Sequence, residues 1–337
     1  MVRRPPSYDP LGSPQSGRRA FESRLTLVAY PLLCLPESSA RRSFKDMAGQ
    51  INHFLITILV GLSGVEDGTA TLPPGMHTSW APHNRTRSAA RSREFANKAF
   101  LAWLVDALDA YIRGLQGSPP LADANVIEGI ERAKREREGL RGRIRAVSAG
   151  TGQYETPEAI LAEVAVVWRN RLVHYQATNR ISGSLEAAAR RRSEEFINLY
   201  QGLMIDDLIK HVENTPSPAP TLKEATAIVR ASHKFVERSD SFLLQRFDVD
   251  SYLREVLRQY LLSGGDSNPE DARIRAGKVW SREFDRRRSM IINIALNSGF
   301  SGYHAGVPNQ VDSAAIDKLA ALKPSEAIAE FGIGRST

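Results

Sequence analysis

The stretch TPEAILAEVAVVWRNRLVHYQ, residues 156–176, decides the fold of this chain. Its start carries three signals of a helix: Thr156 as N-cap, Pro157 at the first helical position and Glu158 in the first turn. Apolar residues then recur at helical spacing as far as Trp168, which indicates a helix that faces a core. The stretch ends in RNRLVH, so ionisable side chains are expected where that core helix ends.

Helical periodicity continues on both sides of this segment, whereas the chain has no convincing β alternation and no repeat of fixed period. We therefore predict an all-α fold. Within it, the apolar segment Ile51–Leu62 is too short to span a bilayer, which predicts a core helix. The expected helices cover residues 44 to between 61 and 68, 88–115, 121–147, 157 to about 176, 185–212, 222–238, 250–262, 269–297 and part of 313–331.

Composition divides the chain into four parts. Residues 1–43 are rich in Pro, Ser, Gly and Arg without a helical period, which predicts a disordered or loosely attached leader. Residues 44–213 are expected to form a helical bundle. NTPSPAP, residues 214–220, holds three prolines and predicts a linker. Residues 221–337 then form a second, smaller helical module, for regulation, target capture or partner binding.

Cysteine usage and the N-terminal pattern bear on the compartment. The single cysteine, Cys34, excludes an intramolecular disulfide and a Cys-rich zinc site, which favours a reducing environment. The apolar run Leu25–Leu35 resembles the core of a secretory signal, but it begins late, follows Glu22 and contains Pro31. We expect a cytoplasmic protein with no membrane association.

Positive charge is carried mostly by arginine. The formal net charge is +7, and 36 of the 45 basic residues are Arg. Arg favours bidentate contact with phosphate or carboxylate, which makes RNA a candidate partner. Solvated helix faces in an Arg-rich chain are the alternative interpretation. The candidate RNA-binding residues are Arg141, Arg143, Arg145, Arg171, Arg286, Arg287 and Arg288.

Several familiar catalytic motifs are missing from the sequence. It has no GxxxxGK[ST] phosphate loop, no GxSxG elbow, no HExxH and no DxDxDG calcium loop. Nucleotide-dependent phosphoryl transfer, serine hydrolysis and zinc proteolysis therefore lose support. We expect neither a metal nor a cofactor.

The RNRLVH segment suits RNA cleavage without metal. Histidine exchanges protons near neutral pH, so His174 could accept the proton of a ribose 2′-hydroxyl or protonate a departing 5′-oxygen. Arg169 could hold the phosphate and offset the charge that builds up on it. Asn170 lies four residues before His174, so on a helix the two project from nearly one face.

Arg169 does not line up with His174 on an ideal helix. The two residues are five positions apart, which separates them by about 140° around the axis. Either the long arginine side chain wraps around the helix, or a two-fold dimer joins two copies in one composite site. Asp106 and Asp109 of a preceding helix are candidates for tuning His174, with an exposed acidic face as the simpler explanation.

The RNxxxH motif at the end of an apolar helix, followed by a polar turn, resembles the catalytic signature of the HEPN superfamily. These are small α-helical bundles, many of which are metal-independent endoribonucleases of anti-phage defence and toxin–antitoxin systems. The resemblance implies Arg169 and His174 as catalytic residues and Asn170 as the polar residue beside the arginine. It also implies a homodimer across the motif helix and a regulatory protein or antitoxin. The products would carry 2′,3′-cyclic phosphate and 5′-hydroxyl ends.

Other interpretations of the same residues stay open. An Arg and a His near a helix C-terminus also complement the helix dipole and bond the last carbonyl groups. A non-catalytic interaction bundle and a sequence-independent nucleic-acid binder are the competing functions. The resemblance covers the motif and the bundle of residues 44–213, and none is identified for residues 221–337.

Overall fold

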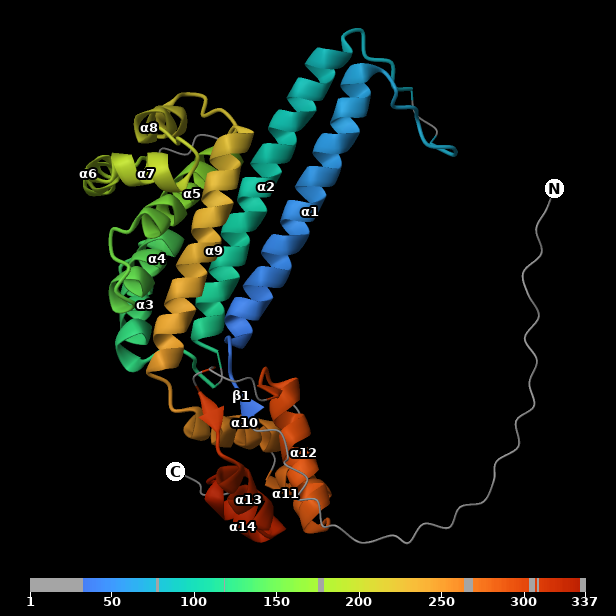
Figure 1. Ribbon diagram of the computed structural model, residues 1–337, viewed down its shortest axis with the longest axis vertical. Coiled ribbons are helices and arrows are strands. Elements are labelled where there is room, and N and C mark those ends of the chain that lie inside the picture. The colour runs from blue at the N-terminus through green and yellow to red at the C-terminus, as the bar shows by residue number, and fades with distance from the viewer. Residues whose placement is uncertain are drawn as a thin grey trace, which may run out of the picture. The chain divides into compact units, whose positions relative to one another are not determined.

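The computed structural model describes residues 33–76, 79–117, 119–174, 179–263, 269–302, 307 and 309–333. Over these residues the chain is mainly helical, as predicted, with three strands of two residues each (Figure 1). The helices are α1 (Ser39–Asp67), α2 (Arg85–Leu115), α3 (Ala124–Arg135), α4 (Gly139–Gly150), α5 (Pro157–Val173), α6 (Gly183–Arg191), α7 (Ser193–Leu199), α8 (Ile205–Glu213), α9 (Leu222–Gln245), α10 (Val249–Leu262), α11 (Pro269–Trp280), α12 (Phe284–Asn297), α13 (Ser313–Ala321) and α14 (Pro324–Glu330).

Helices α1 and α2 form a long antiparallel hairpin (Figure 1). The Ser38 hydroxyl caps α1, and the helix ends at Gly68, whose φ of 76° needs a residue without a Cβ. The Asn84 side chain caps α2. At the start of α1, Gly114 of α2 lies against Ala40, and an added Cβ there would be 2.8 Å from the Ala40 side chain. The small residue therefore allows the two helices to approach closely.

Helix α5 is the centre of the bundle, and its predicted start is confirmed. The Thr156 side chain accepts the Ala159 N–H, and Pro157 occupies the first turn. Every residue from Pro157 to Trp168 is buried, because α2, α4 and α9 pack around the helix. The indole of Trp168 donates to the carbonyl of Pro218 at 3.0 Å. Only the last turn of α5 reaches the surface.

The Pro-rich segment 214–220, which we predicted as a linker, lies between α8 and α9. Residues 32–337 form one compact unit, and α9 packs against α5, α2 and α1. The segment is fastened to the bundle, since the Asn97 amide donates to the Pro220 carbonyl at 2.8 Å and Trp168 bonds Pro218. The proline content correctly predicted that the helix ends before this segment, since α8 ends at Glu213.

Three helices that we predicted as continuous are broken. Residues 121–147 form α3 and α4, and at the break Arg137 adopts a φ of 57° and Gly139 a φ of 66°. Residues 185–212 form α6, α7 and α8, with left-handed backbone at Gln201 and Gly202. The predicted helix 269–297 is interrupted between α11 and α12. In each case neighbouring elements pack on the shorter pieces, so tertiary contacts override the local helical period.

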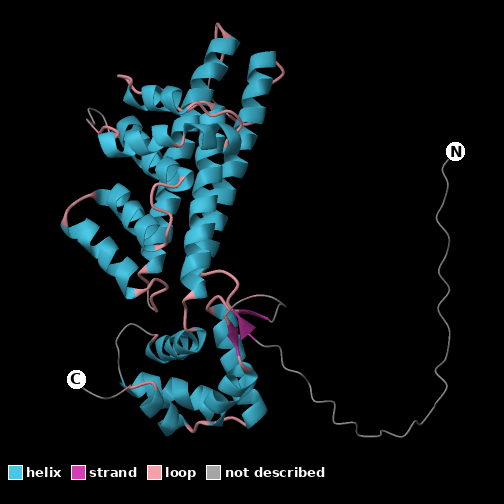
Figure 2. Ribbon diagram, turned by 60° about the vertical axis from the view of Figure 1, so that its left-hand side comes forward, coloured by secondary structure: helices cyan, strands magenta, loops and turns pink. Residues whose placement is uncertain are grey.

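The expected leader ends earlier than predicted. Residues 33–43 belong to the fold, whereas residues 1–32 lie outside the described part of the chain. Strand β1 (Leu33–Cys34) pairs antiparallel with β2 (Ser301–Gly302) and β3 (Gln310–Val311), in the order β2-β1-β3. The strands are magenta in Figure 2. Leu33, Cys34 and Leu35 are almost fully buried. Pairs of residues are too short for an alternating pattern, which explains why the sequence predicted no strand.

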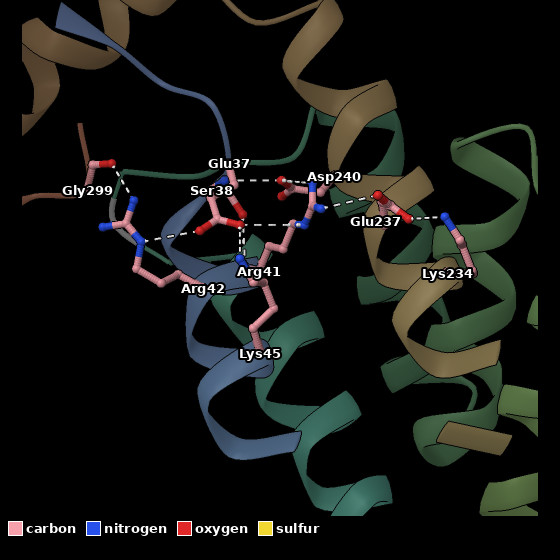
Figure 3. A network of polar contacts seen from close by, with 9 residues as sticks. All are labelled: Glu37, Ser38, Arg41, Arg42, Lys45, Lys234, Glu237, Asp240 and Gly299. Carbon is pink, nitrogen blue, oxygen red and sulfur yellow. Dashed lines mark hydrogen bonds and ion pairs between the residues drawn. The ribbon is translucent and has the colours of Figure 1, made fainter. Parts of the chain in front are cut away.

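A polar network joins the start of α1 to α9 and to the C-terminal helices (Figure 3). The backbone N–H of Ser38 donates to the buried carboxylate of Asp240 at 3.1 Å. Arg41 lies 3.5 Å from Glu237 and 3.9 Å from Asp240. Arg42 donates to the carbonyl of Gly299 at 2.9 Å. These contacts tie residues far apart in the sequence to a single helix terminus.

Candidate active site

The last turn of α5 brings the predicted catalytic side chains to the surface together. Arg169 is partly buried, Asn170 is partly exposed and His174 is exposed. One Nη1 atom of Arg169 donates to the Asn170 amide oxygen at 3.3 Å and lies 3.5 Å from Nε2 of His174. The Nη2 atom lies 3.2 Å from the carboxylate of Asp106 on α2. A single guanidinium group therefore contacts all the other polar side chains of the cluster.

The contact between Arg169 and His174 needs no second copy of the chain. Helix α5 ends at Val173, and His174 is its C-cap, with extended backbone (φ −101°, ψ 112°). Because His174 has left helical geometry, the 140° separation expected on a straight helix does not hold. The long arginine side chain covers the remaining distance. The side chain of Arg169 thus reaches His174 within one chain.

The arginine also favours one tautomer of the histidine. A guanidinium carries only hydrogen-bond donors, so a bond from Arg169 to Nε2 requires a lone pair on that nitrogen. The proton of the neutral ring is then on Nδ1. The distance of 3.5 Å is at the outer limit of a hydrogen bond, which leaves Nε2 able to accept a proton from another group.

The two predicted tuning acids separate in the structure. Asp106 reaches the cluster through Arg169, although its contact is with the arginine and not with His174. Asp109, three residues later on α2, points elsewhere and pairs with Arg143 at 2.7 Å and Arg113 at 3.2 Å. Asp109 is therefore not part of the site, because its carboxylate is held by Arg143 of α4 and Arg113 of α2.

Arg171 serves the fold and is not available as a predicted RNA contact. Its guanidinium donates to the carbonyl groups of Asn179, Glu213 and Asn214 at 2.9, 3.2 and 2.9 Å. These carbonyls lie in the segment after α5 and at the end of α8, so the arginine connects two parts of the chain that meet beside the site. A sequence pattern cannot show this, since the contacts depend on where residue 213 lies in space.

Most of the other candidate RNA-binding arginines are also engaged within the molecule. Arg143 pairs with Asp109, and Arg145 pairs with the buried Glu163 at 3.1 Å. Burial raises the pKa of Glu163, and the neighbouring Arg145 opposes that shift. Arg287 donates to two carbonyl groups of α13 and the turn after it, and Arg288 pairs with Asp317 at 3.0 Å. Arg141 and Arg286 remain candidates, and of these Arg286 is exposed.

Sequence reasoning missed an apolar groove between α1 and α2. The segment Ile51–Leu62 was expected in the core, yet only Ile51 and Leu55 of it are buried, and Phe54 and Ile58 are about half exposed. We name this feature the α1–α2 groove. It has a volume of about 420 Å³ and is lined by Ile51, Phe54, Leu55, Thr57, Ile58, Ser92, Phe95, Ala96, Ala99, Phe100 and Trp103. The signal was present in the sequence, because Phe54, Ile56, Ile58 and Val60 are apolar residues outside the face that Ile51 and Leu55 bury.

Neither a protein-family model, nor a curated protein, nor a solved structure matches the chain. Among the described residues, no group of three or more His, Cys, Asp and Glu side chains is placed to hold a metal ion. The chemistry of the surface cluster on α5 and the shape of the α1–α2 groove are therefore the two observations that bear on function.

Proposed function

We propose that this chain is a metal-independent endoribonuclease of the HEPN type, with Arg169, Asn170 and His174 as its active site. The observation that carries the proposal is the contact of Arg169 with both Asn170 and His174 at an exposed helix end. A cation, an amide and an imidazole close together at one helix end match the requirements of phosphodiester cleavage by an internal nucleophile. The helical fold agrees with the bundle expected for such a protein.

The side chains divide the reaction as follows. Nε2 of His174 accepts the proton of the ribose 2′-hydroxyl, and the 2′-oxygen forms a bond to phosphorus. The bond from phosphorus to the 5′-oxygen breaks, and the leaving oxygen takes up a proton from water or from the protonated histidine. Arg169 stabilises the negative charge on the phosphoryl oxygens in the transition state. The products are a 2′,3′-cyclic phosphate and a 5′-hydroxyl end.

The guanidinium of Arg169 is available to a phosphate only in part, because several of its hydrogens already contact other side chains. Its Nη1 contacts use Asn170 and His174, and one Nη2 hydrogen is directed to Asp106. The second Nη2 hydrogen is a further donor that the guanidinium could offer to a phosphate oxygen. Asp106 orients the guanidinium but also places a negative charge near the substrate phosphate. Binding of RNA therefore competes with this ion pair.

The test is RNA cleavage by the purified full chain in excess EDTA, with end-group analysis of the fragments. We expect cyclic-phosphate ends with the wild-type protein and none with His174→Ala. Val173→Ala is the matched control, because Val173 is the exposed neighbour and carries no proton-transfer group. Equal cleavage by His174→Ala would assign the activity to another site. Intact RNA with the wild-type protein, under conditions where it binds RNA, would contradict the proposal.

A role in anti-phage defence or as a toxin follows from the proposed type. Expression of the wild-type chain should arrest growth of the host cell, and His174→Ala should relieve the arrest. A partner protein that inhibits the toxin would then be expected. Growth arrest that persists with His174→Ala would disconnect toxicity from the site.

A second candidate function is that of a non-catalytic interaction protein, and the α1–α2 groove favours it. Exposed apolar side chains gathered in one groove mark a protein-binding surface. A nucleic-acid binder without catalysis has less support, since five of the seven candidate RNA-binding arginines are engaged in internal contacts. Salt-sensitive RNA binding without cleavage would favour the binder.

The burial of most of α5 restricts where the predicted homodimer across the motif helix could form. Residues Pro157 to Trp168 of α5 lie inside the bundle, so a second copy could meet this helix only at its exposed last turn. A composite site that uses both chains is consistent with this position, but the contact of Arg169 with His174 within one chain does not require it.

A further inference from the structure

The α1–α2 groove carries an inference that does not depend on RNA cleavage. Its rim is formed by large apolar side chains that face outward: Phe54 is 47% exposed, Ile58 46%, Phe95 73% and Trp103 53%. Side chains of this size rarely gather on the open surface of a monomer without a partner. Asp106 lies about one turn beyond Trp103 on the same face of α2.

The face of α2 beside the groove has a pattern that reads the same in both directions. Ser92, Phe95, Ala99, Trp103 and Asp106 follow one another at spacings of 3, 4, 4 and 3 residues. These spacings keep all five side chains on one stripe of the helix. The residue at the centre is small, the next on each side is aromatic and exposed, and the outermost is polar.

We propose that the α1–α2 groove binds a second copy of this chain, with α2 packed antiparallel on the partner's α2 about a two-fold axis at Ala99. In such an isologous contact, a residue that lies n positions before Ala99 meets the partner residue n positions after it. Phe95 then packs on the partner's Trp103. The small side chain at position 99 lets the two helices approach closely at the axis.

The outer positions of the stripe are complementary in charge and hydrogen bonding. Ser92 lies opposite the partner's Asp106, and its hydroxyl can donate to that carboxylate. The preceding residue, Arg91, is exposed and long enough to reach the same carboxylate. Because the contact is two-fold, one such pair between the two copies forms at each end of the apolar centre.

The exposed area fits a dimer of ordinary size. Phe54, Ile58, Phe95 and Trp103 together expose on the order of 450 Å² per copy, taking roughly 200 Å² for a large side chain. A standard interface buries about 800 Å² per partner, including a polar rim. The apolar side chains thus supply somewhat more than half of that area, which is close to the usual non-polar share of an interface, about 56–58%.

This arrangement separates the two candidate active sites. Each Asp106 lies seven residues from the axis, which corresponds to about 10 Å along the helix, so the two sites are roughly 20 Å apart. They would act as two independent sites at the ends of one interface. The partner's Arg91 would approach Asp106 and compete with Arg169 for its carboxylate. Each copy would then loosen the arginine of the other.

A membrane is the alternative occupant that the structure disfavours. Helix α1 is long and apolar enough to cross a bilayer, and only 17% of its most apolar stretch is buried. However, α1 packs along α2, which carries Arg93, Glu94 and Lys98 beside that stretch, and Arg93 pairs with Glu66 of α1 at 3.1 Å. A bilayer would have to accept these charges together with α1.

Sedimentation of the full chain at tens of micromolar tests the proposal. We expect twice the monomer mass for the wild-type protein and the monomer mass for Phe95→Glu. Because Phe95 is mostly exposed, the variant should keep the wild-type circular dichroism and unfolding midpoint. A wild-type monomer at this concentration would overturn the proposal. So would a monomer that binds phosphatidylserine vesicles through Phe95, since this result would assign the groove to lipid.

Cross-linking then tests the position of the axis. A short bis-maleimide should join two copies of Ala99→Cys, because position 99 faces itself across a two-fold axis. Val60→Cys is the matched control, since Val60 is exposed on the opposite flank of α1 and should not cross-link. The single natural cysteine, Cys34, is fully buried and can remain in both variants. A dimer that cross-links through Val60 and not through position 99 would contradict this interface. All these measurements are independent of whether the chain cleaves RNA.

Discussion

The guanidinium of Arg169 and the carboxylate of Asp106 form an ion pair of 3.2 Å between α5 and α2. Asp106 is more than half exposed and Arg169 is partly buried, so the pair lies at the boundary between the bundle and solvent. An exposed pair of this kind contributes little to stability, about 0–1 kcal/mol. Its importance is that Asp106 competes with a substrate phosphate for the guanidinium of Arg169.

Asp106→Asn should therefore strengthen RNA binding. The substitution removes the charge that competes with phosphate for Arg169, and we expect affinity to rise about fivefold at low salt, equivalent to roughly 1 kcal/mol. Fluorescence anisotropy with a labelled single-stranded RNA measures the change, in the His174→Ala background to prevent cleavage. Asp109→Asn is the control and should leave the affinity unchanged, because Asp109 pairs with Arg113 and Arg143. Weaker binding by Asp106→Asn would contradict a competing role.

Arg171→Ala should lower stability and not RNA affinity. The change leaves the carbonyl groups of Asn179, Glu213 and Asn214 without their donor, which should lower the free energy of unfolding by about 2 kcal/mol. Urea denaturation measures this loss. Arg286→Ala, at an exposed position, should stay within about 0.5 kcal/mol of the wild-type protein. If both variants unfold alike, Arg171 does not fasten the segments as the contacts indicate.

Gly114→Ala should destabilise the α1–α2 hairpin. The new methyl group would lie 2.8 Å from the Ala40 side chain, so the helices must separate, at a cost of about 1–3 kcal/mol. Gly61→Ala provides the opposite case, since no atom lies within 4 Å of the added group. That substitution should stabilise α1 by about 0.5–1 kcal/mol. Thermal unfolding of both variants distinguishes a steric effect from a general response to alanine.

Asp240 should make stability depend on pH. Burial raises the pKa of its carboxyl above the ordinary value of 3.8, although the bond from Ser38 and the charge of Arg41 oppose the shift. The folded state therefore binds the proton more tightly than the unfolded state, and the contribution of Asp240 to stability falls as pH rises from 3.8 through the raised pKa.

The measurement for Asp240 compares urea unfolding of the wild-type protein and Asp240→Asn over that pH range. Asparagine keeps an acceptor for the Ser38 N–H but cannot ionise. The variant should therefore gain stability relative to the wild-type protein as pH rises. A constant difference between the two proteins would show that Asp240 has an ordinary pKa in the folded state.

The parts of the fold that sequence predicted well are those fixed by local chemistry. The Thr156 cap, the proline after it and the apolar run to Trp168 define α5 correctly, because each signal acts within a few residues. The placement of Arg169, Asn170 and His174 at one exposed helix end follows from the same segment. Asp106 was one of two candidate acids for tuning His174, with an exposed acidic face as the simpler explanation, and its contact with Arg169 was not predicted.

The parts that sequence missed depend on contacts between distant residues. Arg171 looked like a phosphate ligand, and its real partners lie up to 44 residues away at Thr215. The helix breaks at Arg137, whose backbone is left-handed. No proline in this stretch marks the break in the sequence. Ile51–Leu62 looked like a core segment because hydropathy does not say whether the chain itself covers an apolar helix.

The small sheet has a consequence for biosynthesis. Leu33 and Cys34 are buried between strands of the C-terminal region, and Cys34 bonds a carbonyl 268 residues later in the chain. During translation these residues leave the ribosome long before their partners exist. The α1–α2 hairpin can form early, but β1 must wait until nearly the whole chain has been made. A nascent chain that stops before residue 301 would therefore expose Leu33 and Leu35 to chaperones and proteases, which provides a built-in check that synthesis has passed the C-terminal strands.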